Sequence, residues 1–157
     1  MDVFVAGVGL FVAEPGPDGQ SVWSPQKSVS SALFAAPVEV NVLLADGQSA
    51  DLNLIAEVLG DVDSFLLTGL RFLHSALMAD PETFGLDPTD AAKLEPFDPT
   101  AFPVDMPQLN FYAEADTEWL MRFAQGLLPI CEPYGVAVAF AGSEPARVED
   151  LSESAQI

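Results

Sequence analysis

The chain has 157 residues, of which 24 are acidic and 5 are basic, so its formal net charge at neutral pH is −19. Half of the residues are hydrophobic, which excludes a disordered acidic tail. Nucleic acid and anionic membrane are not expected as ligands, because their phosphates would face a surface of like charge. The length predicts a single domain over residues 1–157, large enough to bury a substantial core.

The cysteine content and the N-terminus bear on the compartment. Cys131 is the only cysteine in the sequence, so no disulfide can form within the chain. The apolar run at residues 3–13 is about as long as the hydrophobic part of a signal peptide, but Asp2 precedes it where basic residues are needed. The run is also too short to span a bilayer. We therefore interpret it as a buried strand and expect a cytoplasmic protein.

Three N-terminal segments have strand-like composition. Residues 3–13 are rich in β-branched and aromatic side chains and have no polar face, which predicts a central strand. A turn at residues 14–19 leads to a second strand over residues 21–34, broken or bulged near Pro25. Residues 38–44 alternate between apolar and polar side chains. Together the three segments predict an antiparallel meander.

The middle of the chain changes to helical spacing. Residues 52–59 predict a short helix that Asp51 caps. A longer helix follows, with Asp63 or Ser64 as its N-cap, and it ends near Asp80–Pro81 because a residue before proline avoids helical geometry. Its predicted core stripe is Val62, Leu66, Leu70, Leu73 and Leu77.

Residues 81–107 form the least regular part of the chain. They contain six of the 13 prolines, mixed with acidic residues, which excludes a long helix or a central strand. We interpret them as an irregular connection that is functional or flexible. Phe84, Phe97 and Phe102 argue against free disorder, because they can hold the connection against the globule.

The C-terminal part predicts more strands. Residues 109–113 alternate as a strand, and a hairpin turning at Asp116–Thr117 leads to residues 118–124. These last residues also fit a helix, although we favour a strand. A final strand is predicted over residues 136–140, followed by an acidic tail over residues 143–157. The whole pattern predicts an α+β fold, with a mostly antiparallel sheet and a central helical segment packed on one face.

The sequence offers few groups for catalysis. His74 is the only histidine, which we interpret as a boundary side chain partly packed on the core. Glu132 beside Cys131 makes that thiolate scarcer, so a cysteine nucleophile is not expected. Close carboxylate pairs arise by chance in so acidic a chain, and no complete calcium, dinucleotide or phosphate loop is present. We expect a protein that is not an enzyme and has no catalytic residue, cofactor or metal.

The densest acidic stretch supplies a candidate binding site. Glu114, Asp116 and Glu118 lie beside Tyr112 and Trp119, and aromatic side chains flanked by carboxylates suit lysine and arginine side chains of a partner. These five residues are the predicted partner-binding site for a basic protein. Two simpler interpretations stay open: the acidity serves solubility or adaptation to high salt, and Trp119 is a core residue.

The C-terminal stretch FYAEADTEWLMRF…EPYGVAVAF, after an apolar sheet and a helical middle, resembles small acidic bacterial immunity proteins of toxin–antitoxin and contact-inhibition systems. The resemblance implies inhibition by stoichiometric binding, in which the protein caps the active site of a basic toxin, such as a nuclease, or blocks its nucleic-acid surface. The residues that carry it are Phe111, Tyr112, Trp119, Phe123, Pro133, Tyr134, Gly135 and Phe140.

Two other functions remain open at this point. The first is a small enzyme or ligand-binding domain that uses carboxylates in a cleft between sheet and helix. Two facing acidic residues with raised pKa values would favour this function. The second is a structural subunit, for which a large apolar surface patch would be the mark.

Overall fold

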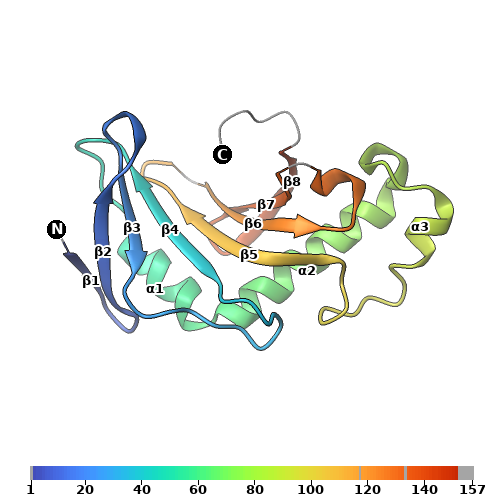
Figure 1. The fold of residues 1–157 in the computed structure, drawn as a ribbon, viewed down its shortest axis with the longest axis horizontal. Helices are drawn as coiled ribbons and strands as arrows, with labels where there is room; N and C mark the ends of the chain where they lie inside the picture. The colour runs from blue at the N-terminus through green and yellow to red at the C-terminus, as the bar shows by residue number, and fades with distance from the viewer. Residues whose placement is uncertain (1, 117, 133, 152–157) are drawn as a thin grey trace.

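The computed structural model describes residues 2–116, 118–132 and 134–151 (Figure 1). In this part of the chain, eight strands form one sheet in the order in which they occur along the sequence. Every neighbouring pair is antiparallel except β4 and β5, which are parallel. Helices α1 and α2 lie against one face of the sheet. The predicted α+β fold, with a mostly antiparallel sheet and a helical segment on one face, is confirmed.

The helices all lie between β4 and β5, and such a crossover is what a parallel pair of strands requires. The strands are β1 (Asp2–Val5), β2 (Gly9–Pro15), β3 (Ser21–Pro25), β4 (Glu39–Leu44), β5 (Val104–Phe111), β6 (Glu118–Gly126), β7 (Val136–Ala141) and β8 (Glu144–Asp150). The helices are α1 (Leu52–Gly60), α2 (Val62–Ala79) and α3 (Pro88–Ala92), with short 3-10 turns η1 (Pro17–Gly19), η2 (Pro81–Phe84) and η3 (Pro129–Cys131).

The N-terminal apolar run is a hairpin at the edge of the sheet, so its prediction as one central strand was wrong. Strands β1 and β2 pair antiparallel, with Phe4 opposite Leu10. The chain reverses between them because Gly7 and Gly9 adopt positive φ angles of 79° and 123°. Residues other than glycine rarely adopt such angles. Val5 is buried, whereas Phe4 is 68% exposed.

The antiparallel order of the predicted meander is confirmed, but its second strand, predicted over residues 21–34, covers only Ser21–Pro25. Strand β3 ends at Pro25, which has no backbone N–H to donate to a neighbouring strand. The chain then runs irregularly to β4, with a single bridge between Val29 and Val38. Strand β4 buries Val40, Val42 and Leu44 on the side of the helices, as the alternation of its sequence predicts.

The two main helices begin differently. The Asp51 carboxylate caps α1 by accepting a hydrogen bond from the backbone N–H of Leu54 at 3.1 Å, as predicted. The N-cap of α2 is Asp61, so the prediction of Asp63 or Ser64 was wrong. The Asp63 carboxylate instead accepts hydrogen bonds from Ser31 Oγ and from the backbone N–H of Ala32, and thereby ties the connection after β3 to the first turn of α2.

The core lies between α2 and the sheet. The four leucines of the predicted stripe are fully buried, whereas Val62 is half-buried. Gly69 lies on the same face of α2 and is also buried, and a methyl group at its Cα would overlap the sulfur of Met121 on β6. The helix therefore approaches the sheet closely at this point.

The proline-rich connection packs on the globule through aromatic side chains. Phe102 is 8% exposed, and Phe84 and Phe97 are half-buried against the core, as predicted. The ring of His74 on α2 packs against Phe97 and Phe102, with centroid distances of 5.1 and 6.1 Å. The prediction that residues 81–107 are irregular throughout was wrong at its end, because β5 begins at Val104 and holds Pro107 within a central strand.

The C-terminal region holds the three strands β6, β7 and β8, of which β8 was not predicted. Residues 118–124 belong to strand β6, so the helical alternative was wrong. The predicted acidic tail was wrong over most of its described length, since β8 pairs with β7 from Glu144 opposite Ala141 to Asp150 opposite Val136. Thr117 of the predicted turn and residues 152–157 of the tail lie outside the described residues. Within the described residues, no helix is long and apolar enough to cross a membrane.

Candidate functional site

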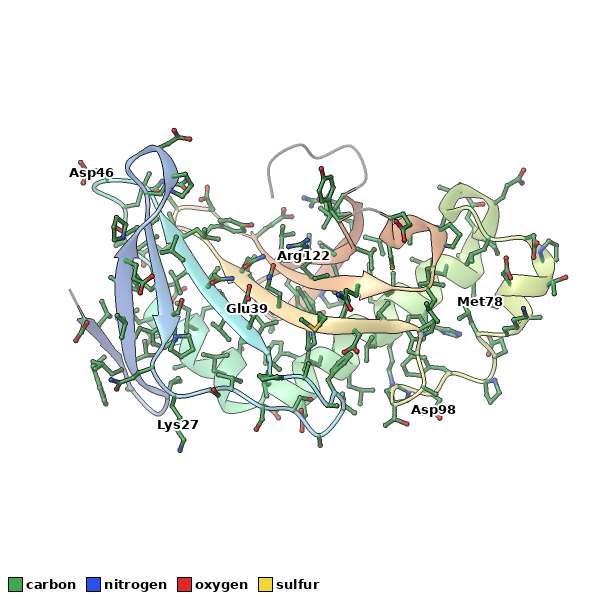
Figure 2. The ribbon with its side chains drawn as sticks, viewed as in Figure 1. Lys27, Glu39, Asp46, Met78, Asp98 and Arg122 are labelled. Atoms are coloured by element: carbon green, nitrogen blue, oxygen red, sulfur yellow. The ribbon has the colours of Figure 1, made fainter. Side chains whose placement is uncertain are left out.

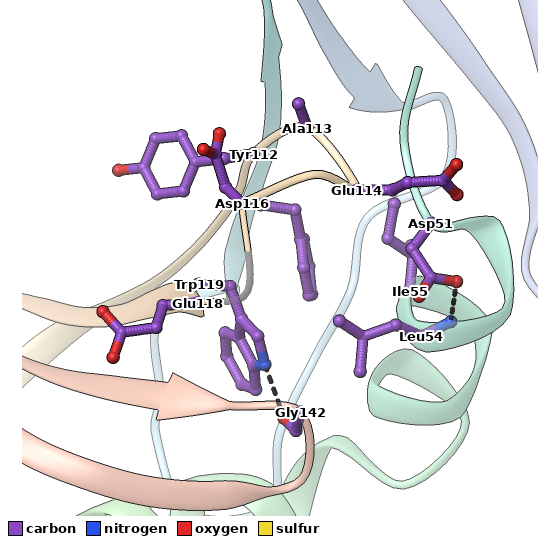
Figure 3. A pocket seen from close by; sticks show the side chains of 11 residues that line it. Asp51, Leu54, Ile55, Tyr112, Ala113, Glu114, Asp116, Glu118, Trp119 and Gly142 are labelled. Carbon is purple, nitrogen blue, oxygen red and sulfur yellow. Dashed lines mark hydrogen bonds between the residues drawn. The ribbon is translucent and has the colours of Figure 1, made fainter. Parts of the chain in front are cut away.

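A small pocket lies at the end of the sheet where β5 ends and β6 begins, with a volume of about 230 Å³ (Figure 3). It brings together all five residues of the predicted partner-binding site. The start of α1 and the turn between β7 and β8 complete its wall. It is lined by Asp51, Leu54, Ile55, Phe111, Tyr112, Ala113, Glu114, Asp116, Glu118, Trp119 and Gly142.

Backbone contacts between distant segments hold the pocket together. Ala50, just before α1, forms an isolated bridge with Ala113, just after β5. The backbone N–H of Glu114 donates to the carbonyl of Ser49 at 2.8 Å. These contacts place the capped start of α1, with Asp51, beside the turn that carries Glu114.

Trp119 forms the floor of the pocket. Its indole N–H donates to the carbonyl of Gly142 at 2.8 Å, and its ring stacks on Phe111 and Phe140 with centroid distances of 5.1 and 4.5 Å. The side chain is 1% exposed, so the interpretation of Trp119 as a core residue is confirmed. Its contribution to any partner contact is the shape of the pocket rather than an exposed ring face.

Tyr112 is half-buried at the mouth. Burial raises the pKa of the Tyr112 phenol, and the positive charge of Arg122 partly opposes that shift. The phenol therefore stays protonated at neutral pH and keeps a hydrogen to donate. In Figure 3, the Tyr112 and Glu118 side chains lie on one side of the mouth, and those of Glu114 and Asp51 lie on the other.

Glu118 already has a cationic partner. Arg147 on β8 donates two hydrogen bonds to its carboxylate, at 2.7 and 2.8 Å, and a third to Glu149 at 2.6 Å. The hydrogen bonds from Arg147 lower the pKa of Glu118, so this carboxyl stays ionised but its charge is compensated.

Glu114 and Asp116 carry the uncompensated charge of the mouth. Both are exposed, and in the described part of the chain no lysine, arginine or histidine lies within 4 Å of either carboxylate. Asp51 uses its carboxylate to cap α1. The mouth therefore presents two carboxylates without a cationic neighbour in the described chain, with Asp116 on the side of Tyr112 and Glu114 on the opposite side (Figure 3). This arrangement suits cationic side chains of a partner that approach an apolar pocket.

The two nucleophilic or titratable residues weighed for catalysis lie away from this pocket. His74 Nε2 lies 3.1 Å from the carbonyl oxygen of Leu94 and 3.5 Å from a carboxylate oxygen of Glu95, so it links α2 to the proline-rich connection. Cys131 is 4% exposed, and burial raises the pKa of its thiol, with a smaller contribution from Glu132. No three metal-ligating side chains gather among the described residues.

A second polar arrangement lies on the sheet face that the helices leave uncovered, called the open face below (Figure 2). Asn41 donates to Glu39 and Asn110, and Gln108 also donates to Glu39. Arg122 donates to Gln108 at 3.1 Å. These groups satisfy one another across β4, β5 and β6, so they explain how polar residues are accommodated in central strands.

Sequence reasoning missed the parts of the site that come from distant segments. The sequence assigned Asp51 only a capping role and did not predict that Gly142 lines the pocket. The ion pair between Arg147 and Glu118 was also missed, because these residues lie 29 positions apart in the sequence. Charged and apolar residues alternate over 146–149, and this pattern could have predicted strand β8 and therefore the pairing of Arg147 with a neighbouring strand.

Comparisons of this chain with protein-family models, with curated proteins and with solved structures find no match.

Proposed function

We propose that this protein is a non-enzymatic inhibitor that neutralises a basic protein, such as a bacterial toxin domain, by forming a stoichiometric complex in the cytoplasm. The observation that carries the proposal is the mouth of the pocket, where Glu114 and Asp116 are exposed and have no cationic neighbour among the described residues. Lysine or arginine side chains of the partner would pair with these two carboxylates. The net charge of −19 would speed the encounter with such a partner.

The size of the pocket supports a protein partner. Sites for small molecules and cofactors usually occupy about 300–1,000 Å³. This pocket has about 230 Å³, which is closer to the volume of one long side chain. The apolar lining of the pocket, which includes the half-buried Leu54, would contact the methylene groups of that side chain while a carboxylate at the mouth binds its charged end.

The electrostatics of Glu118 argue against its use as a general acid. An enzyme that used two carboxylates as acid and base would need one of them to have a raised pKa. The pKa of Glu118 is lowered by Arg147, which is the opposite direction. The lone buried Cys131 is compatible with a reducing cytoplasm.

Matched charge reversals test the proposal. One variant carries Glu114→Lys and Asp116→Lys at the mouth. Its control carries Glu82→Lys in η2, which follows α2, and Glu132→Lys just after η3, which follows β6. Both variants change the net charge by +4, from −19 to −15. Each is immobilised, exposed to a bacterial lysate at low salt and eluted with high salt, and the eluted proteins are identified by mass spectrometry.

We expect the wild type and the control to retain the same cationic protein in a one-to-one ratio, and the mouth variant to lose it. Equal loss in both variants would show that overall charge, and not the pocket, attracts the partner, and would contradict the proposal. Retention of the partner by the mouth variant would also contradict it.

A further inference from the structure

The sheet is open and has two edges, and β8 forms one of them. Within the described residues no strand pairs with the outer side of either β1 or β8. In an antiparallel edge strand, alternate residues direct their backbone N–H and C=O groups away from the sheet. These groups can hydrogen-bond an extended segment of another protein, which then adds a strand to the sheet.

Strand β8 is held rigidly for such a role. It pairs with β7 at every residue except the bulged Ala146, α2 packs against it, and Val148 contacts the core. On the open face, Arg147 is fixed by its hydrogen bonds to Glu118 and Glu149. Because the strand is already ordered, binding of an added segment would cost no conformational entropy of β8.

The start of β8 has features that prevent it from pairing with strands of other molecules. Pro145 has no backbone N–H, and a bulge interrupts the register with β7 between Ala139 and Phe140. Such features shorten an exposed edge. Ala146 is the extra, unpaired residue of this bulge, so the regularly paired part runs from Arg147 to Asp150.

The charge of β8 indicates what can pair with it. The sequence from Glu144 to Asp150 contains three acidic residues and one arginine, and that arginine already binds two glutamates. Like charges opposite one another destabilise neighbouring strands, whereas opposite charges stabilise them. A second copy of β8 is therefore disfavoured and a cationic segment is favoured. The other edge, β1, has four residues with one acid and exposes Phe4, so it lacks this preference.

The edge is continuous with the candidate pocket. Gly142 lines the pocket, and β8 begins two residues later at Glu144. We propose that an extended, lysine- or arginine-rich segment of the partner adds to the sheet along β8, while one of its cationic side chains enters the pocket. This inference rests on the proposed function and specifies the part of the basic partner that binds.

The test uses two blocked peptides of alternating lysine and valine, about seven residues long to match the edge. One has an ordinary backbone, and the other is N-methylated at every internal backbone nitrogen, which keeps the charge but removes the hydrogen-bond donors. Affinity is measured by calorimetry, and hydrogen exchange of the β8 amides is followed by NMR. Ala146→Lys and Ala146→Glu variants change the charge of the edge at an exposed position in opposite directions.

We expect the ordinary peptide to slow exchange of alternate amides over residues 146–150, and the methylated peptide to bind at least about tenfold more weakly, because several backbone hydrogen bonds are lost. Ala146→Lys should weaken binding of the ordinary peptide and Ala146→Glu should strengthen it. Equal affinity of the two peptides, or protection of β1 in place of β8, would overturn the inference.

The two proposals can fail separately. If the wild type retains a cationic partner that the mouth variant loses, but neither peptide protects β8, the edge inference alone is wrong. If the ordinary peptide pairs with β8 while the mouth variant still retains the partner, the pocket proposal is wrong and edge pairing stands.

Discussion

Replacing Trp119 with phenylalanine should weaken the fold at the floor of the pocket. Phenylalanine keeps the stacking between Phe111 and Phe140 but loses the hydrogen bond to Gly142, whose net contribution is about 0.5–1.5 kcal/mol. The atoms removed from a side chain that is 1% exposed also leave a cavity, which costs about 1.5 kcal/mol. We therefore expect Trp119→Phe to lower the free energy of unfolding by about 2–3 kcal/mol.

Thermal and urea unfolding followed by circular dichroism would measure this loss. In a domain of this size each kcal/mol shifts Tm by about 2–4 °C, so Tm should fall by roughly 4–12 °C. Trp23→Phe is the matched control, because Trp23 is half-buried on β3 and its substitution should cost less than about 1 kcal/mol. An unchanged Tm for Trp119→Phe, or an equal loss in both variants, would refute the packing account of the floor.

Three further outcomes follow from the structure. Gly69→Ala should destabilise the protein by about 1–3 kcal/mol in urea unfolding, because the added methyl group overlaps Met121. The control Gly60→Ala has free space around the added methyl group and should be neutral or stabilising. A stabilising effect of Gly69→Ala would contradict this account. Cys131 should react with iodoacetamide at pH 8 at least about a hundredfold more slowly than in urea, because burial raises the pKa of its thiol and blocks access; equal rates would contradict it. Arg147 lowers the pKa of Glu118, so their contact stabilises the fold above the unfolded value of about 4.3 and is lost as pH falls through the lower, folded value. Glu118→Gln should therefore lose less stability than the wild type in urea titrations between about pH 5 and 3, and parallel losses would contradict this.

The sequence predicted those elements whose periodicity comes from facing one core. Strand β4 alternates because only one of its faces meets the helices, and the leucines of α2 recur at helical spacing because they meet the sheet. The prediction failed at residues 3–13, where a continuous apolar run concealed a reversal. The positive φ angles of Gly7 and Gly9 make the turn of a hairpin within this run.

The end of the chain illustrates the opposite error. Strand β8 is mostly polar, so composition predicted a tail. An edge strand packs only part of its surface, and here charged side chains on the open face are stabilised by one another and by Glu118. Cross-strand pairing of this kind does not appear in local composition, because it depends on which strands become neighbours.

The candidate site was partly predictable for a related reason. Tyr112, Glu114, Asp116, Glu118 and Trp119 occupy one hairpin, so closeness in sequence predicted closeness in space. The burial of Trp119 and the pairing of Glu118 with Arg147 depend on β7 and β8. Only the structure therefore separates the free carboxylates from the one that is already compensated.

The most direct test of the proposed inhibitor is hydrogen–deuterium exchange of the whole protein, free and in complex with the retained cationic protein. Binding at the pocket and along β8 predicts slower exchange over residues 112–118 and 142–150, with little change in the described part of the proline-rich connection. Protection centred on Glu39 and Arg122 of the open face, with residues 112–118 and 142–150 unchanged, would contradict the account.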